Sequence, residues 1–216
     1  MRSLLVALLL YGGVAGADEK CGDQLLAARG HLLASQRAMS PSRTAESKSR
    51  AAWAAVPPSC RTGMWYVTAA NILRNPGSSE EPLVAGDVRF TTPAEALAAG
   101  LAVCPKDPEL VAYIAYLSRI APKLAPPLPA ESCANVAAAD PSLHAYVCGV
   151  QAFTAGQPAE AEKHLVAVKS PRFPDVAELL AAARKKTGHK SASPGPPTPA
   201  LACDPFCPME SWRAAK

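Results

Sequence analysis

The feature that most constrains this chain is a helix-start signal that recurs every 33 residues, at Pro108, Pro141 and Pro174. Asp107 and Asp140 precede the first two prolines. An aspartate carboxylate accepts hydrogen bonds from the free amides of a first helical turn, and proline fits the first helical position because no amide hydrogen is needed there. The signal therefore predicts three evenly spaced helices.

The residues that follow each proline place apolar side chains on one stripe of a helix, at i, i+3, i+4 and i+7. The three stripes are Leu110, Tyr113, Ile114 and Leu117; Leu143, Tyr146, Val147 and Val150; and Val176, Leu179, Leu180 and Ala183. Each stripe needs an apolar partner, and the period leaves room for one more helix per repeat. We expect these partner helices at 92–104, 131–139 and 158–168, the first beginning with the capping box at 92–95.

Paired helices with this period are typical of α-solenoids, in which each unit buries its apolar face on its neighbours. The composition is rich in Ala and Pro, with few aromatic residues and few strand-like segments. We therefore predict an all-α fold of stacked antiparallel helical hairpins over residues 18–187. Earlier helices are expected at 18–39, 44–56 and 63–73, and a solvated loop at 75–92, where only 86–90 suggests an extended piece.

Gly149 and Gly156 lie seven residues apart and are followed by Ala161 and Leu165. In this arrangement, residues 145–168 resemble a tetratricopeptide repeat. Ala145 stands where that family usually has a tryptophan, and the period here is one residue shorter than the family's. The resemblance, which extends over about 92–186, implies a stacked helical array. It also implies an interaction module with a protein or peptide partner.

Residues 1–17 have the pattern of a secretory signal peptide. Arg2 precedes an apolar run over 4–14, and Ala15-Gly16-Ala17 forms a small-residue cleavage site. The apolar run is short for a bilayer span, and charged residues follow it at once. We therefore predict cleavage near Ala17 and a secreted or periplasmic chain with no stable membrane span.

The C-terminal segment 188–216 has a different composition from the helical region. Residues 191–199 are rich in Pro, Ser and Gly, and such a sequence buries too little apolar surface to order itself. We interpret the segment as a flexible tail. The one basic block, at 184–186, lies at an expected helix end, where positive charge is favoured, so no nucleic-acid partner is predicted.

The chain contains seven cysteines, and in an oxidising compartment these are expected to form disulfides. Residues equidistant from the turn of an antiparallel hairpin face each other. Cys21 and Cys60 are centred on the turn expected at 40–41, and Cys133 and Cys148 on the junction at 140–141. We predict these two bridges.

Cys203 and Cys207 form a possible local loop in the tail, which leaves Cys104 over. Cys104 has helical spacing with apolar neighbours and is most simply a small buried residue. The alternative is a bond from Cys104 to one tail cysteine.

No catalytic or metal-binding motif stands out, and neither a cofactor nor a metal is expected. His31, His144, His164 and His189 fall on different expected elements, without the spacing of a zinc-binding helix. The tail pair is separated by three residues and lacks a following histidine, which argues against a thiol redox or metal site there. The chain is therefore expected not to be an enzyme.

Three functions remain open at this point. The first is an exported, non-enzymatic scaffold that binds a protein or peptide, with Tyr113, Tyr146 and Phe153 as candidate groove residues; each of these has packing in the helical stripe as its alternative role. The second is a thiol-active or metal-carrying protein that acts through Cys203 and Cys207. The third is a structural component of the cell envelope, with the tail as a spacer or anchor.

Overall fold

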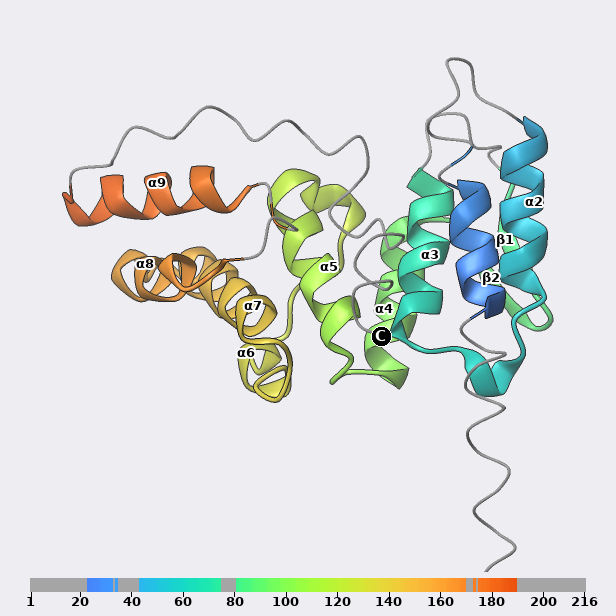
Figure 1. Ribbon diagram of the computed structural model, residues 1–216, viewed down its shortest axis with the longest axis horizontal. Helices are drawn as coiled ribbons and strands as arrows, with labels where there is room; N and C mark the ends of the chain where they lie inside the picture. Colours follow the sequence, from blue (N-terminus) through green and yellow to red (C-terminus); the bar gives the residue numbers. More distant parts are fainter. Residues whose placement is uncertain are drawn as a thin grey trace, which may run out of the picture.

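The computed structural model describes residues 23–32, 34, 43–74, 81–169, 173 and 175–189. Over this part of the chain the protein is mainly helical, with one small β-hairpin (Figure 1), so the all-α prediction is confirmed there. The predicted signal peptide and almost all of the predicted tail lie outside the described residues. None of the described helices is long and apolar enough to cross a membrane.

The N-terminal part is centred on a pair of stacked tryptophans. Residues 23–32 are helical, and α2 (Arg43–Ala54), η1 (Pro58–Cys60) and α3 (Gly63–Arg74) follow them. Trp53 and Trp65 stack with ring centroids 4.3 Å apart, and each indole N–H donates to the other residue's backbone carbonyl, at 3.0 and 3.1 Å. Both rings are fully buried, so Trp65 is a packing residue, as its sequence context indicates.

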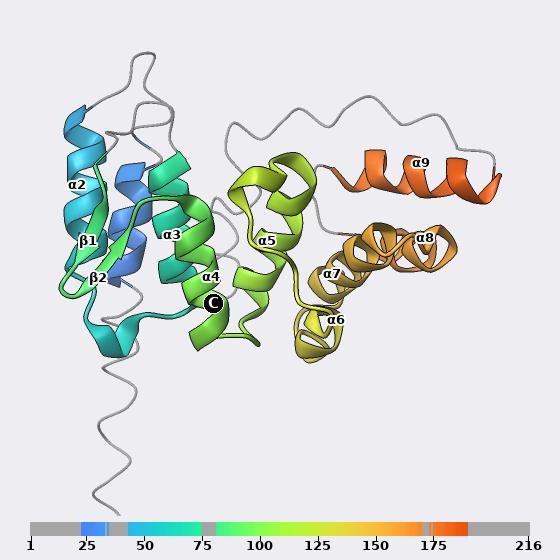
Figure 2. The same cartoon turned by 180° about the vertical axis from the view of Figure 1, so that it is seen from behind.

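The expected loop at 75–92 contains an antiparallel hairpin instead. Strands β1 (Leu83–Ala85) and β2 (Val88–Phe90) pair with Leu83 opposite Phe90. Gly86 takes a positive φ of 66° in the two-residue turn, a conformation that glycine adopts without strain. Because Leu83, Ala85 and Phe90 are buried, the prediction of a solvated loop is wrong over 83–90. The hairpin lies against α2 and α4 (Figure 2).

The predicted helix starts are confirmed at three places. Thr92 and Glu95 form the capping box of α4 (Pro93–Val103). Asp107 accepts from the Leu110 amide at 3.0 Å and begins α5 (Pro108–Ile120). Asp140 accepts from two amides of the first turn of α7 (Pro141–Thr154). In each case proline occupies the first helical turn.

The remaining elements depart from the predicted boundaries in two places. Helix α8 (Pro158–Val166) forms where it is expected, but the partner helix expected at 131–139 is reduced to α6 (Ser132–Asn135), after η2 (Pro122–Leu124) and a proline-rich stretch. Helix α9 (Val176–Thr187) begins after the expected proline, and the side chain of Asp175 does not cap it. That carboxylate accepts a hydrogen bond from Tyr146 instead.

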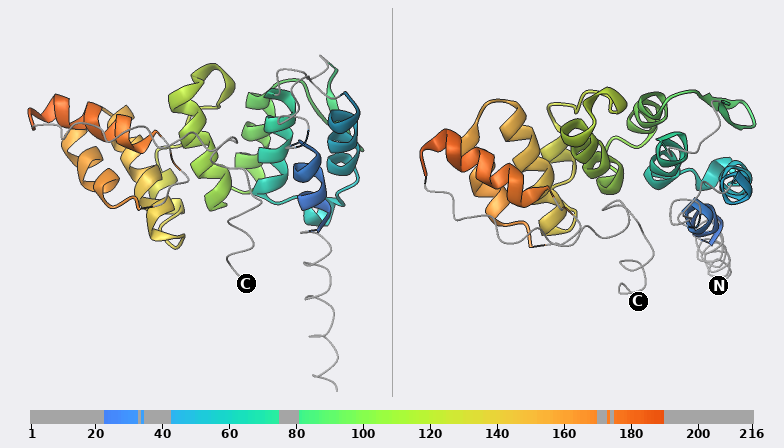
Figure 3. Two further views of the ribbon diagram at one scale, coloured as in Figure 1. Left: turned by 45° about the horizontal axis from the view of Figure 1, so that its top comes forward. Right: turned by 90° about the horizontal axis from the view of Figure 1, so that it is seen from above.

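The helices follow one another along the long axis of the molecule (Figures 1 and 3). Helix α5 contacts α3 on one side and α7 on the other, and α7 also contacts α9. Helix α4 packs on α3, α6 on α7, and α8 on both α7 and α9. The first two predicted stripes are buried in full, whereas the third is buried at Leu179 and Ala183 only.

Helices α7 and α8 approach closely at Gly149. A Cβ atom at this position would lie 2.7 Å from Cγ and Cδ2 of Leu165, a side chain that is itself buried. The helix–helix contact therefore requires glycine here.

We predict that Gly149→Ala lowers the free energy of unfolding by about 1–3 kcal/mol, because the added methyl group overpacks the contact with Leu165. Gly30→Ala is the matched control: Gly30 is also helical, but nothing lies within 4 Å of an added Cβ there. This control should be neutral or stabilising, since alanine favours helix. Equal effects of the two substitutions in urea denaturation would contradict the close packing.

Candidate functional site

Two of the three aromatic residues proposed for a binding groove lie in the core. Tyr113 and Tyr146 are fully buried. The Tyr113 hydroxyl donates to Asn71 Oδ1 at 2.7 Å, and the Tyr146 hydroxyl donates to the Asp175 carboxylate at 3.0 Å. The groove prediction is therefore wrong for both tyrosines, and their alternative role in packing is the one observed.

Phe153 is the member of the three that reaches the surface. It is half-buried in the last turn of α7 and lies between two cations. The guanidinium carbon of Arg119, in α5, is 5.4 Å from the ring centroid, and Nζ of Lys186, in α9, is 4.6 Å from it. Both distances are within the range of a cation–π interaction. We refer to these three residues as the Phe153 surface.

Arg119 has hydrogen-bonding capacity that the described residues leave unused. Its Nε is buried without an acceptor in this part of the chain. Its Nη2 lies 4.0 Å from a carboxylate oxygen of Glu178, a side chain that is 83% exposed. An ion pair of that length between partly solvated groups contributes little. The outer end of the Arg119 guanidinium, rather than its buried Nε, is therefore the part that can donate to an incoming acceptor.

A buried aromatic and acidic cluster lies close to the Phe153 surface. Tyr146 and Phe173 stack with ring centroids 4.0 Å apart, and Tyr146 also binds Asp175. Burial raises the pKa of the Asp175 carboxyl, although the Tyr146 hydrogen bond and the charge of Arg119 oppose that rise. Burial and the Asp175 charge together raise the pKa of Tyr146, which keeps its hydroxyl protonated.

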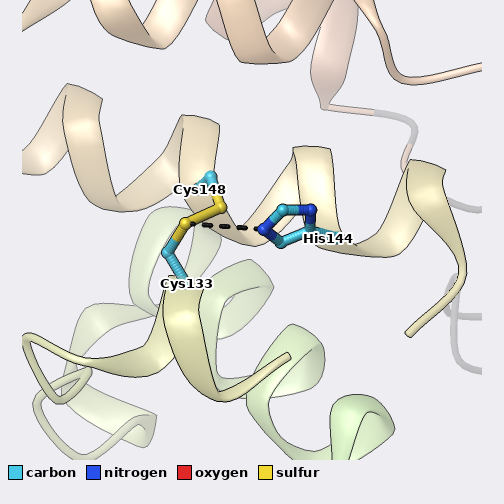
Figure 4. A group of neighbouring side chains, drawn as sticks. All are labelled: Cys133, His144 and Cys148. Carbon is cyan, nitrogen blue, oxygen red and sulfur yellow. Dashed lines mark hydrogen bonds between the residues drawn. A yellow bond between two sulfur atoms is a disulfide. The ribbon is translucent and has the colours of Figure 1, made fainter. Parts of the chain in front are cut away.

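A second group of reactive side chains lies where α6 meets α7. Cys133 and Cys148 form a disulfide with Cα atoms 4.7 Å apart, which confirms the predicted pairing. His144 is one turn before Cys148 on α7, and its Nε2 is 3.7 Å from Cys133 Sγ (Figure 4). The three side chains place one imidazole nitrogen and two sulfurs within 4.8 Å of one another. Cys148 is buried, whereas Cys133 and His144 are half-buried.

The segment that carries Cys133 is attached to α7 by more than the disulfide. The Gln151 side chain accepts from the Cys133 amide at 2.9 Å and donates to the Ala130 carbonyl. Gln151 lies one turn beyond Cys148, so three successive turns of α7 face the same segment. Cys133 is thus positioned by backbone contacts as well as by its sulfur.

Of the other cysteines, the structure describes Cys60 and Cys104. Cys60 is disulfide-bonded, and its predicted partner Cys21 lies outside the described residues, as do Cys203 and Cys207. Cys104 is a free, half-buried thiol that packs against the core. Burial, and then the charge of Asp107, raise the pKa of this thiol, so it is a weaker nucleophile at neutral pH than an ordinary cysteine.

Two groups of neighbouring side chains in the structure were not predicted from the sequence. His144 and Cys148 are spaced i, i+4, and this spacing, added to the predicted Cys133 bridge, was a sufficient signal for the cysteine–histidine group. The Phe153 surface has a weaker signal: Arg119, Phe153 and Lys186 lie 34 and 33 residues apart, close to one repeat. Comparison with protein-family models, curated proteins and solved structures finds no match to this chain.

We predict a pH-dependent effect of Asp175→Asn. Because the folded-state pKa of this carboxyl is raised, the folded protein binds the proton more tightly than the unfolded chain, and the ionised form opposes folding. At neutral pH the variant should have a higher free energy of unfolding than the wild type. This advantage should shrink as the pH falls towards the ordinary carboxyl value of about 4.

Thermal or urea unfolding between those pH values measures this effect, with the exposed carboxyl of Glu81, replaced by Gln, as the control. A loss of stability in Asp175→Asn that is the same at every pH would show that the hydrogen bond from Tyr146 outweighs the burial of charge.

Proposed function

We propose that this protein is an exported, non-enzymatic scaffold of tetratricopeptide-like helical repeats that binds a protein or peptide partner. The repeat architecture is supported by the order of helix contacts, in which α3, α5, α7 and α9 meet in succession while α4, α6 and α8 alternate with them. Gly149 and Leu165 meet across α7 and α8, at positions that carry the family resemblance. Export is supported by the Cys133–Cys148 bridge, since disulfides persist in oxidising compartments.

The binding proposal rests on one observation: three different helices contribute to the Phe153 surface. Its three residues come from α5, α7 and α9, so the surface exists only when successive repeats are stacked. A half-buried aromatic ring with arginine beside it is also the kind of residue pair that contributes most at protein interfaces. A phenylalanine exposed on a single helix would not depend on the stacking of helices and would not support a binding role.

The chemistry of this surface specifies the partner. Two cations beside one ring favour a carboxylate, which arginine binds well. The Phe153 ring between them favours an apolar neighbour to that carboxylate. We therefore infer a partner segment in which an Asp or Glu lies next to an apolar residue.

The test is affinity purification from the compartment to which the chain is exported, with wild type, Lys186→Glu and Phe153→Ala as baits. Lys163→Glu is the matched control, because it makes the same charge reversal on an exposed side chain of α8. We expect one partner to be retained by wild type and by Lys163→Glu. In a titration, the two surface variants should bind that partner at least about tenfold more weakly. A loss of this size is expected when a residue that contributes more than about 1 kcal/mol to the binding free energy is removed.

Lys186 is exposed, so its replacement should leave the melting temperature unchanged and its effect on binding can be interpreted directly. A partner that binds Lys186→Glu and Phe153→Ala as tightly as wild type would refute this surface as the binding site.

A further inference from the structure

We propose that Cys133, His144 and Cys148 form a binding site for one zinc ion when their disulfide is reduced, so that the bridge and the metal are alternative states of the same three residues. This inference does not depend on the proposed scaffold function. It rests on the geometry of Figure 4 and on the donor atoms that it brings together.

The donor set suits zinc. Two thiolates and one imidazole are ligands that Zn²⁺ prefers, and together they disfavour the hard cations Mg²⁺ and Ca²⁺. Three protein ligands leave the fourth tetrahedral position for water or for a group from a partner. Cys133 and His144 are half-buried, which gives an ion access from solvent, while Cys148 closes the inner side.

One of the three distances between the ligand atoms already suits zinc. With Zn–S bonds of about 2.3 Å and Zn–N bonds of about 2.0 Å, two ligand atoms of a tetrahedral site lie about 3.5–3.8 Å apart. The separation of 3.7 Å between His144 Nε2 and Cys133 Sγ already falls in that range. Reduction has to let the two sulfurs move apart from bonding contact, and Cys148 Sγ, which lies within 4.8 Å of the imidazole nitrogen, has to take its place at the ion. Side-chain rotation can achieve both.

The ligands remain in place without the bridge. His144 and Cys148 are fixed on one face of α7 by their spacing of four residues. The backbone amide of Cys133 donates a hydrogen bond to Gln151 Oε1. The Gln151 side chain also donates to the Ala130 carbonyl, which holds the same segment. The Gln151 contacts do not involve sulfur, so they survive reduction and keep the third ligand near the other two.

Thiol–disulfide exchange converts one state into the other. A dithiol reductant supplies two electrons and two protons, the sulfur–sulfur bond breaks to give two thiols, and the dithiol becomes a disulfide. Zinc then binds as the two thiols lose their protons to solvent. A disulfide oxidant reverses the sequence: it takes back two electrons, re-forms the Cys133–Cys148 bond and releases the ion.

The test uses the full chain with the other five cysteines (Cys21, Cys60, Cys104, Cys203 and Cys207) replaced by serine, reduced with a phosphine and titrated with Co²⁺ without oxygen. Cobalt is the probe because it reports thiolate coordination by absorption, whereas zinc is colourless. We expect a thiolate-to-cobalt band that added zinc abolishes. His144→Ala keeps every thiol but removes one ligand, and it should weaken cobalt binding at least about 10-fold. Even the loss of a residue that only supports a metal ligand typically weakens metal binding by about 10-fold to 100-fold. His164→Ala, on α8, should have no effect.

Two results of the cobalt titration would overturn the proposal: no thiolate–cobalt band, or a band that is identical in His144→Ala and wild type. The second would assign the metal to thiols without the histidine. If reduction itself lowers the helix content, added zinc must restore it in wild type and not in His144→Ala, because metal binding is then coupled to folding. Failure of zinc to restore the helices would equally refute the site.

Discussion

Hydrogen bonds from two buried tyrosines set the spacing of the alternate helices. Tyr113 and Tyr146 each lie five residues after the proline that begins their helix, 33 residues apart, and each hydroxyl bonds a side chain from outside its own helix. Leaving such a buried hydroxyl without an acceptor costs about 1–3 kcal/mol. Tyr113 therefore fixes α5 against α3, and Tyr146 fixes α7 against the start of α9. Apolar stripes alone would permit the helices to slide.

Helix α7 carries each of the features on which function is proposed to depend. One side holds Tyr146 against the core, and another holds His144 and Cys148 against the segment of Cys133. Its last turn presents Phe153 between Arg119 and Lys186. The disulfide and the Gln151 contacts thus stabilise the helix that also forms the centre of the Phe153 surface. The proposed partner site and the cysteine–histidine group therefore both depend on α7.

Local signals in the sequence predict the helices well. Asp107, Asp140 and the capping box at Thr92 begin helices where they should, because these side chains act on amides only two or three residues away. The Cys133–Cys148 bridge was predictable because the two cysteines are equidistant from the junction at 140–141. By contrast, helical periodicity cannot separate a core tyrosine from a groove tyrosine, since both have the same spacing. Strand β2 lies within the stretch 86–90 that suggested an extended piece, whereas β1 and its pairing were missed because strands of three residues have little periodicity.

The central claim is that alternate helices pack directly against one another through their buried aromatic residues. A nuclear Overhauser spectrum of the full chain tests it most directly. Our account predicts cross-peaks from the Tyr113 ring to the Asn71 side-chain amide, and from the Tyr146 ring to the Phe173 ring, whose centroid is 4.0 Å away. A folded, helical protein that lacks both sets of cross-peaks would contradict the account.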